Sequence, residues 1–186
     1  MTEDAGVVPS IARDAKIVLG VIAERRRSTS PWQEHVWLPT GVVPGAAALE
    51  PWTTMRETPD VVQFYAGEYE IELNPRETGN YQVNLAAEQP AIYVVLRFDD
   101  AAPLGVRVHL VTASPAEAQG YLESGSDIVE RVPMPEDVIR TLEAYMAAYH
   151  VEQPFHKRQR QKLDPRKVGF GRAAAPGKAD GGRHGR

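Results

Sequence analysis

The chain has 186 residues and a formal net charge of −4, and it contains no cysteine. A chain without cysteine has no disulfide, no thiol nucleophile and no cysteine-ligated zinc or iron–sulfur site. The charge is divided unevenly, because 23 of the 25 acidic residues lie in residues 1–155, whereas residues 156–186 hold 10 of the 21 basic residues. We therefore predict a flexible leader over residues 1–14, one acidic domain over 15–155 and a basic disordered tail over 156–186.

The first elements expected along the chain are strands. Residues 17–23 are a continuous apolar run, half of it β-branched, which is typical of a strand buried on both faces. Residues 32–43 predict a second strand, interrupted at Pro39. Residues 44–60 are rich in proline and predict a long loop, with Trp52 anchoring it to the core.

A period of two then predicts a meander of four strands. Residues 65–73 alternate apolar side chains with glutamates, which indicates a half-buried antiparallel strand. After a turn rich in Asn, Pro and Gly, residues 81–85 alternate again and predict the returning strand of a hairpin. Residues 92–98 and 106–110 add two further strands, and short turns join all four.

Two helices follow the predicted strands. The Ser114 hydroxyl can cap the free amide of Glu117, and the Glu117 carboxylate can bond back to the Ser114 amide. Pro115 suits the first helical position, and Gly125 suits the end of that helix. Residues 135–149 predict a second, amphipathic helix. We expect the two helices to bury these side chains against the sheet: Tyr121, Leu122, Leu142, Tyr145 and Met146.

The predicted fold class is α+β, with one antiparallel sheet of five to six strands, curled and barrel-like, and two C-terminal helices packed on it. The first apolar run, Ile17 to Ala23, is too short to span a bilayer. The N-terminus is acidic where a secretory signal requires positive charge. We therefore expect a cytoplasmic protein.

Several short motifs occur between residues 16 and 160, among them Pro31-Trp32-Gln33, Pro51-Trp52-Thr53, Tyr65-Ala66-Gly67, Tyr93-Val94-Val95-Leu96-Arg97, His109-Leu110-Val111-Thr112-Ala113-Ser114-Pro115 and Val132-Pro133-Met134-Pro135. Through these motifs the chain resembles an uncharacterised proteobacterial domain-of-unknown-function family. The genes of that family neighbour those of molybdenum-dependent formate dehydrogenases. The resemblance implies a role in making, targeting or regulating such an enzyme, although none of the motifs is a reaction signature.

The polar residues indicate no catalytic constellation. No two histidines have the i, i+4 spacing of a helical zinc motif, so we predict no metal site and no cofactor. Ser114 lies near His109 in sequence, but no nucleophile-elbow motif surrounds it. The amides of that helix start could bind an anion, together with Arg97 and His109. Helix capping alone explains the same serine.

Two surfaces are candidates for binding a protein partner. Trp32, Trp37 and Trp52 form either an aromatic anchor patch or part of the core. The tail opens with Lys157, Arg158 and Arg160, and such a basic arm either solubilises the protein or binds an acidic partner.

Three functions follow as expectations. The first is a non-enzymatic accessory or assembly protein for a molybdenum formate dehydrogenase system, whose protein partner is a dehydrogenase subunit or a maturation factor. The alternative is a small-molecule or cofactor binder, or an enzyme, with an anion site near Arg97, His109 and Ser114. The third is weak nucleic-acid binding by the tail, which the acidic domain disfavours.

Overall fold

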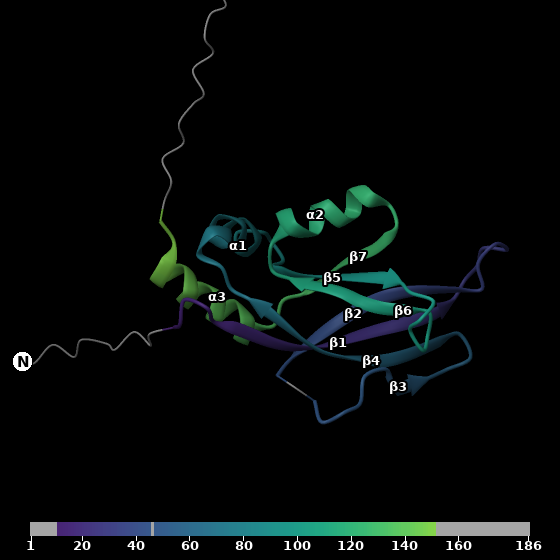
Figure 1. The fold of residues 1–186 in the computed structure, drawn as a ribbon. Helices are drawn as coiled ribbons and strands as arrows, with labels where there is room; N and C mark the ends of the chain where they lie inside the picture. The colour runs from purple at the N-terminus through teal and green to yellow at the C-terminus, as the bar shows by residue number, and fades with distance from the viewer. Residues whose placement is uncertain (1–10, 46, 152–186) are drawn as a thin grey trace, which may run out of the picture. The chain divides into compact units, whose positions relative to one another are not determined.

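The computed structural model describes residues 11–45 and 47–151, which contain seven strands and three α-helices. Figure 1 shows how these elements are arranged. The strands form two antiparallel sheets, with the orders β2-β1-β4-β3 and β6-β5-β7. In chain order the elements are β1 (Lys16–Arg27), β2 (His35–Pro44), β3 (Thr53–Glu57), β4 (Val61–Glu72), the 3₁₀ turn η1 (Pro75–Glu77), α1 (Thr78–Leu85), β5 (Ala91–Phe98), β6 (Val106–Thr112), α2 (Pro115–Ser124), β7 (Asp127–Pro133) and α3 (Glu136–Tyr149).

The apolar run near the N-terminus is a strand, as predicted, and β1 is one of the two inner strands of the first sheet. β1 pairs with β2 on one side and with β4 on the other. Leu19, Val21 and Ala23 are fully buried. Val18 and Ile22, which alternate with them toward the other face, are only partly buried, so the predicted burial on both faces holds only in part.

β5 has the same role in the second sheet, between β6 and β7. The two sheets and α3 share one hydrophobic core, to which the first sheet contributes Leu19 and Phe64, the second Ile92 and Leu96, and α3 Leu142. α2 covers the other face of the second sheet, and α1 lies beside α3 (Figure 1).

The α+β class is confirmed, but the single curled, barrel-like sheet is wrong, because the strands form two separate open sheets. The predicted meander of four strands is wrong at residues 81–85, which belong to α1 rather than to a returning strand. This helix buries Thr78, Tyr81 and Asn84, and Val83 is 66% exposed. Because helix α1 replaces the hairpin, β5 does not pair with β4 and begins a second sheet.

Two strands lie where none was predicted. β3 lies inside the predicted loop, where it pairs with only the first part of β4, Val62 to Tyr65. β7 pairs with β5 from Ala91 to Arg97, although only Val132 of its residues is buried. Neither strand has a fully apolar face, so hydrophobic alternation gives little signal for either one.

The two C-terminal helices are confirmed. The Ser114 hydroxyl accepts a hydrogen bond from the Glu117 amide at 3.3 Å, and Gly125 ends α2 with a φ of 65°. The reciprocal capping bond is absent, because the Ser114 amide donates to Thr112 Oγ1 instead. The prediction that Leu122 is buried is wrong, since it is 55% exposed.

α3 packs as predicted, with Leu142 and Tyr145 buried and Met146 partly buried against the core. None of the helices within residues 11–45 and 47–151 is both long and apolar enough to span a membrane. The predicted tail and most of the predicted leader lie outside the described residues.

One buried polar side chain holds three segments together. Asn84 is 2% exposed, and its amide nitrogen donates to the carbonyls of Ala91 and Ala113, each at 2.7 Å. Its amide oxygen accepts from the Ala91 N–H at 3.1 Å. The end of α1 is thereby tied to the start of β5 and to the residue that precedes the α2 cap.

Replacing Asn84 with alanine should lower the free energy of unfolding by about 2–4 kcal/mol, because it leaves one buried N–H and two buried carbonyls without their partner. Urea denaturation followed by circular dichroism measures this change. Gln82→Ala, on the exposed face of the same helix, is the control and should stay within about 0.5 kcal/mol of the parent. An equal, small effect of both substitutions would contradict the structural role of Asn84.

Candidate functional site

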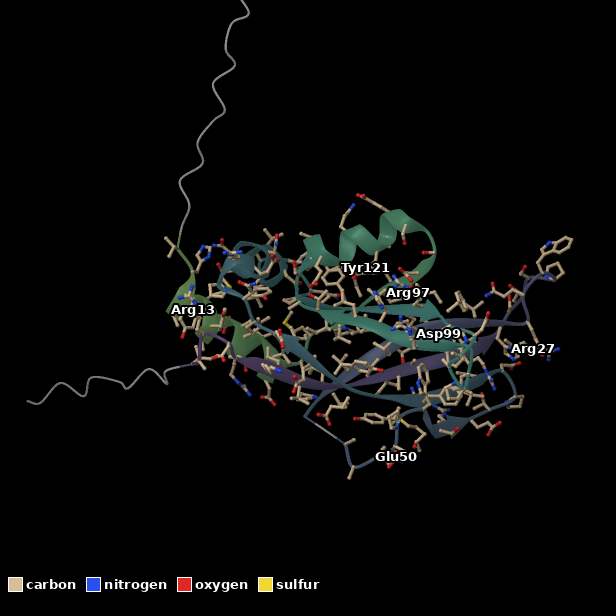
Figure 2. The ribbon with its side chains drawn as sticks, in the orientation of Figure 1. Arg13, Arg27, Glu50, Arg97, Asp99 and Tyr121 are labelled. Carbon is tan, nitrogen blue, oxygen red and sulfur yellow. The ribbon has the colours of Figure 1, made fainter. Side chains whose placement is uncertain are left out.

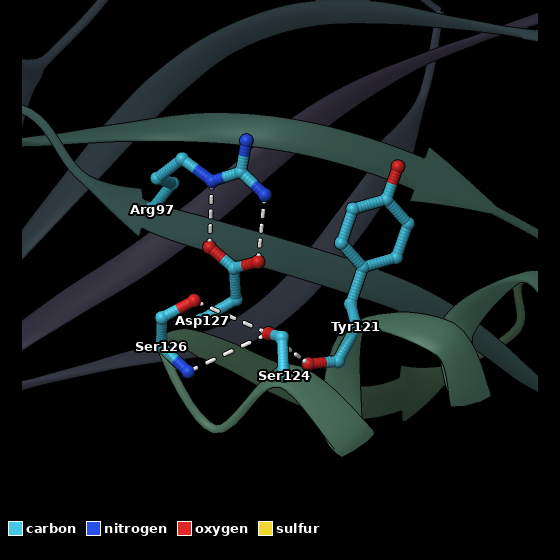
Figure 3. Close-up of polar contacts among 5 residues, drawn as sticks. All are labelled: Arg97, Tyr121, Ser124, Ser126 and Asp127. Atoms are coloured by element: carbon cyan, nitrogen blue, oxygen red, sulfur yellow. Dashed lines mark hydrogen bonds and ion pairs between the residues drawn. The ribbon is translucent and has the colours of Figure 1, made fainter.

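A forked ion pair lies between the second sheet and α2 (Figure 3). Figure 2 labels its arginine, Arg97, together with Tyr121 of α2. Arg97 of β5 donates from Nε and Nη2 to the two carboxylate oxygens of Asp127, each at 2.7 Å. The Asp127 side chain is 1% exposed, whereas that of Arg97 is 36% exposed. The two residues pair across neighbouring strands, so the ladder between β5 and β7 sets their approach.

Tyr121 of α2 joins this pair to His109 of β6. The Arg97 guanidinium lies 5.9 Å from the centre of the Tyr121 ring, which is a cation–π distance. The His109 ring meets the same tyrosine edge-on, with centroids 5.2 Å apart. Two of the three predicted anion-site residues, Arg97 and His109, therefore lie around one aromatic side chain.

The contacts between Arg97, Asp127 and His109 determine the charges of these three side chains. The hydrogen bonds from Arg97 hold the pKa of Asp127 below its ordinary value. Burial, followed by the positive charges of Arg97 and Arg107, lowers the pKa of His109, which therefore remains uncharged at neutral pH. His109 Nδ1 is also buried without a hydrogen-bond partner in the part of the chain described. Arg97 is thus neutralised by Asp127, and His109 supplies no charge to an anion.

The third predicted residue, Ser114, is engaged elsewhere. Its hydroxyl donates to Glu77 at 2.9 Å and accepts from the Glu117 amide, and the residue is 1% exposed. Ser114 precedes Tyr121 by seven residues, about 10 Å along the helix axis. The carboxylate of Glu77 occupies the hydroxyl's donor direction, so no contact in the structure supports anion binding at this helix start.

The three tryptophans do not form one patch. Trp37 is 6% exposed and packs edge-on against Trp52 at 5.7 Å. Both rings contact Phe64, and the Arg25 guanidinium lies 5.9 Å from the Trp37 ring. Trp32 lies in the turn between β1 and β2 and is 93% exposed. Of the predicted aromatic anchors, Trp32 alone offers its whole ring to a partner.

The basic residues predicted to contact a partner, Lys157, Arg158 and Arg160, lie outside the described residues. Within the described residues, no three His, Asp or Glu side chains are grouped so that they could hold a metal ion. The roles predicted for these residues and for the tryptophans remain predictions.

The feature that sequence reasoning missed is an open groove of about 1140 Å³. One wall is the end of β4 and the turn after it, and the other is the end of β6, Leu110 to Thr112, with the first turn of α2. Five acidic side chains line it against one arginine, Arg13: Asp14, Glu70, Glu72, Glu77 and Glu117. The alternating glutamates of β4 were visible in the sequence, but the opposite wall is set by the packing of the second sheet.

The ion pair makes a prediction about pH. Asp127→Asn should lower the thermal midpoint at neutral pH, because Arg97 loses its charged partner and Asp127 is buried. Since the folded pKa of Asp127 is depressed, the pair stabilises the fold above the unfolded value of about 3.9. The difference between parent and variant should shrink as the pH falls from about 4 through the folded pKa.

Thermal scans from neutral to acidic pH measure this difference, and Asp99→Asn, at an ion pair in which both side chains are partly exposed, is the matched control. A midpoint difference for Asp127→Asn that is constant down to acidic pH would contradict the assigned ion pair.

Comparison with known proteins gives one result. A family described as a protein of unknown function, DUF3305, matches residues 18–159. No curated protein matches the chain, and no solved structure matches it. The match covers the two sheets from residue 18 on, all three helices and the groove lining except Arg13 and Asp14. The chain therefore belongs to the DUF3305 family of proteins of unknown function.

Proposed function

We propose that this protein is a non-enzymatic accessory protein that acts by binding another protein. We further propose that the partner is a subunit or a maturation factor of a molybdenum formate dehydrogenase system. An open strand edge beside the acidic groove supports the first part. The second part is motivated by the motif resemblance, which spans about residues 16–160 and includes Pro31-Trp32-Gln33 and Val132-Pro133-Met134-Pro135.

The observation that carries the proposal is this open strand edge. β6 pairs with β5 on one side and, within the described residues, with no strand on the other. β3 covers β4 only from Val62 to Tyr65, so the same side of β4 is open from Ala66 to Glu72. Unpaired backbone N–H and C=O groups at an edge are a template for a strand from another chain.

The other candidate function has weaker geometric support. An anion site near Arg97, His109 and Ser114 requires a free positive charge, yet Arg97 is held by both oxygens of Asp127. Ser114 Oγ donates to Glu77, which would repel an anion. Protein binding requires neither group to be released.

The proposal is tested by affinity purification from the native host with three tagged baits: the full chain, the chain ending at residue 155, and the full chain with Trp32→Ala. The full chain should recover a dehydrogenase subunit or a maturation factor. Removing residues 156–186 or the exposed Trp32 ring should reduce recovery, because both were predicted to contact the partner.

Val36→Ala is the matched control for Trp32, because it is also an exposed apolar residue, 41% exposed, on the same hairpin. It should leave recovery unchanged. If mass spectrometry finds neither a dehydrogenase subunit nor a maturation factor with any bait, the proposed partner class is wrong.

A further inference from the structure

We propose that the groove beside β6 binds an extended, lysine- or arginine-rich segment of a partner protein, which adds to β6 as an outer strand. The proposed segment deepens the protein-binding function and rests on it. The geometry of two sheet edges, the side chains along β6 and the charge of the groove select this kind of ligand.

β6 is the strand that an incoming segment can pair with over its whole length. Within the described residues, Val106 to Thr112 pair with no strand on the outer side, and they include no lysine or proline. The charged side chain of β6, Arg107, is paired with Asp99 at 3.0 Å. A bulge interrupts the register with β5 between Val95 and Leu96, without closing the outer side. On β4 the open part, Ala66 to Glu72, is equally long, but Pro51 lies against Gly67 near its start.

The charge of the groove lining determines which charge the bound partner segment must carry. Glu70 and Glu72 of β4, Glu117 of α2 and Asp14 all line the groove. Lys16 bonds to Glu70 at 2.6 Å and to Glu72 at 3.3 Å, and Arg13 is the lining's single basic side chain. The lining keeps an excess of negative charge, so it attracts basic side chains and repels acidic ones.

An added strand would present its side chains alternately to the two sides. One set would face the acidic lining, which the partly exposed Leu110 also borders, and the other set would point away from it. Main-chain hydrogen bonds to β6 would supply affinity, and basic residues at every second position would supply specificity. A segment with lysine or arginine alternating with small apolar residues meets both requirements.

The test uses the full chain and three synthetic peptides of about eight residues, a usual strand length. The first alternates lysine with valine, the second has glutamate in place of lysine, and the third has proline in place of valine and so lacks half of its backbone N–H groups. Isothermal titration calorimetry should give a micromolar dissociation constant for the first peptide, weakening with salt. It should show no binding of the other two.

Two variants of the chain locate the contact. Glu70→Gln with Glu72→Gln should weaken binding of the lysine peptide about fivefold, because two groove charges are lost and Lys16 is released. Glu68→Gln, on the same exposed face of β4 but outside the groove lining, should change it less than about twofold. Circular dichroism of each variant confirms that it is folded.

Amide hydrogen exchange then identifies the paired strand. The lysine peptide should slow exchange in residues 106–112 and leave residues 127–133, at the opposite edge of the same sheet, unchanged. No binding at millimolar peptide, equal binding of the proline peptide, or no protection of β6 would overturn the proposal.

A second copy of this chain is the competing occupant of the edge. Sedimentation velocity should show a monomer whose mass is independent of concentration. A dimer that the lysine peptide does not dissociate would assign the edge to self-association and overturn the proposal. If the peptide fails but the Glu70→Gln, Glu72→Gln bait still recovers a dehydrogenase subunit or maturation factor, the proposed function stands and only the groove assignment falls.

Discussion

The hydrogen bonds of Asn84 are the constraint on which the arrangement of the second half of the domain depends. A buried amide that satisfies two carbonyls and one N–H is strongly favoured over any arrangement that leaves these groups unpaired and out of water. Its partners, Ala91 and Ala113, belong to segments 22 residues apart in the sequence. One side chain thus fixes where β5 begins and where α2 is capped relative to α1.

This constraint also determines which strand edges are left open at the surface. Asn84 ties the end of α1 to the start of β5, and β5 pairs with β6 and β7 rather than with β4. The domain therefore has two open sheets instead of a closed barrel. A closed barrel has no free edge, whereas two stacked sheets leave edges that must be covered, shielded or used. The open sides of β4 and β6 border the same groove, whose acidic lining gives the edge a preferred kind of partner.

Local chemistry explains which elements could be predicted from the sequence. Ser114, Pro115 and Gly125 determine the ends of α2 through interactions within a few residues, so these three residues suffice to predict where the helix begins and ends. The strand at Ile17 to Ala23 was equally clear, because a long β-branched apolar run has few alternatives.

The misreadings have a common physical cause, which is contact between distant segments. Residues 81–85 fit a strand by alternation, and their helical state is set by the burial of Asn84 among groups from other elements. Trp32 and Trp37 are five residues apart and chemically identical, yet one is 93% and the other 6% exposed, because one lies in the turn and the other on the strand. Strand order, and with it the open edge of β6, is not encoded in any local pattern.

The central claim is that the outer edge of β6 is free in the unliganded protein, and amide hydrogen exchange of the full chain measures this most directly. Amides of β5, paired on both sides, should exchange only through global unfolding. Alternate amides of β6, those that point away from β5, should exchange at least about a hundredfold faster. Protection of every β6 amide to the level of β5 would show that the edge is already covered in solution and would contradict the account.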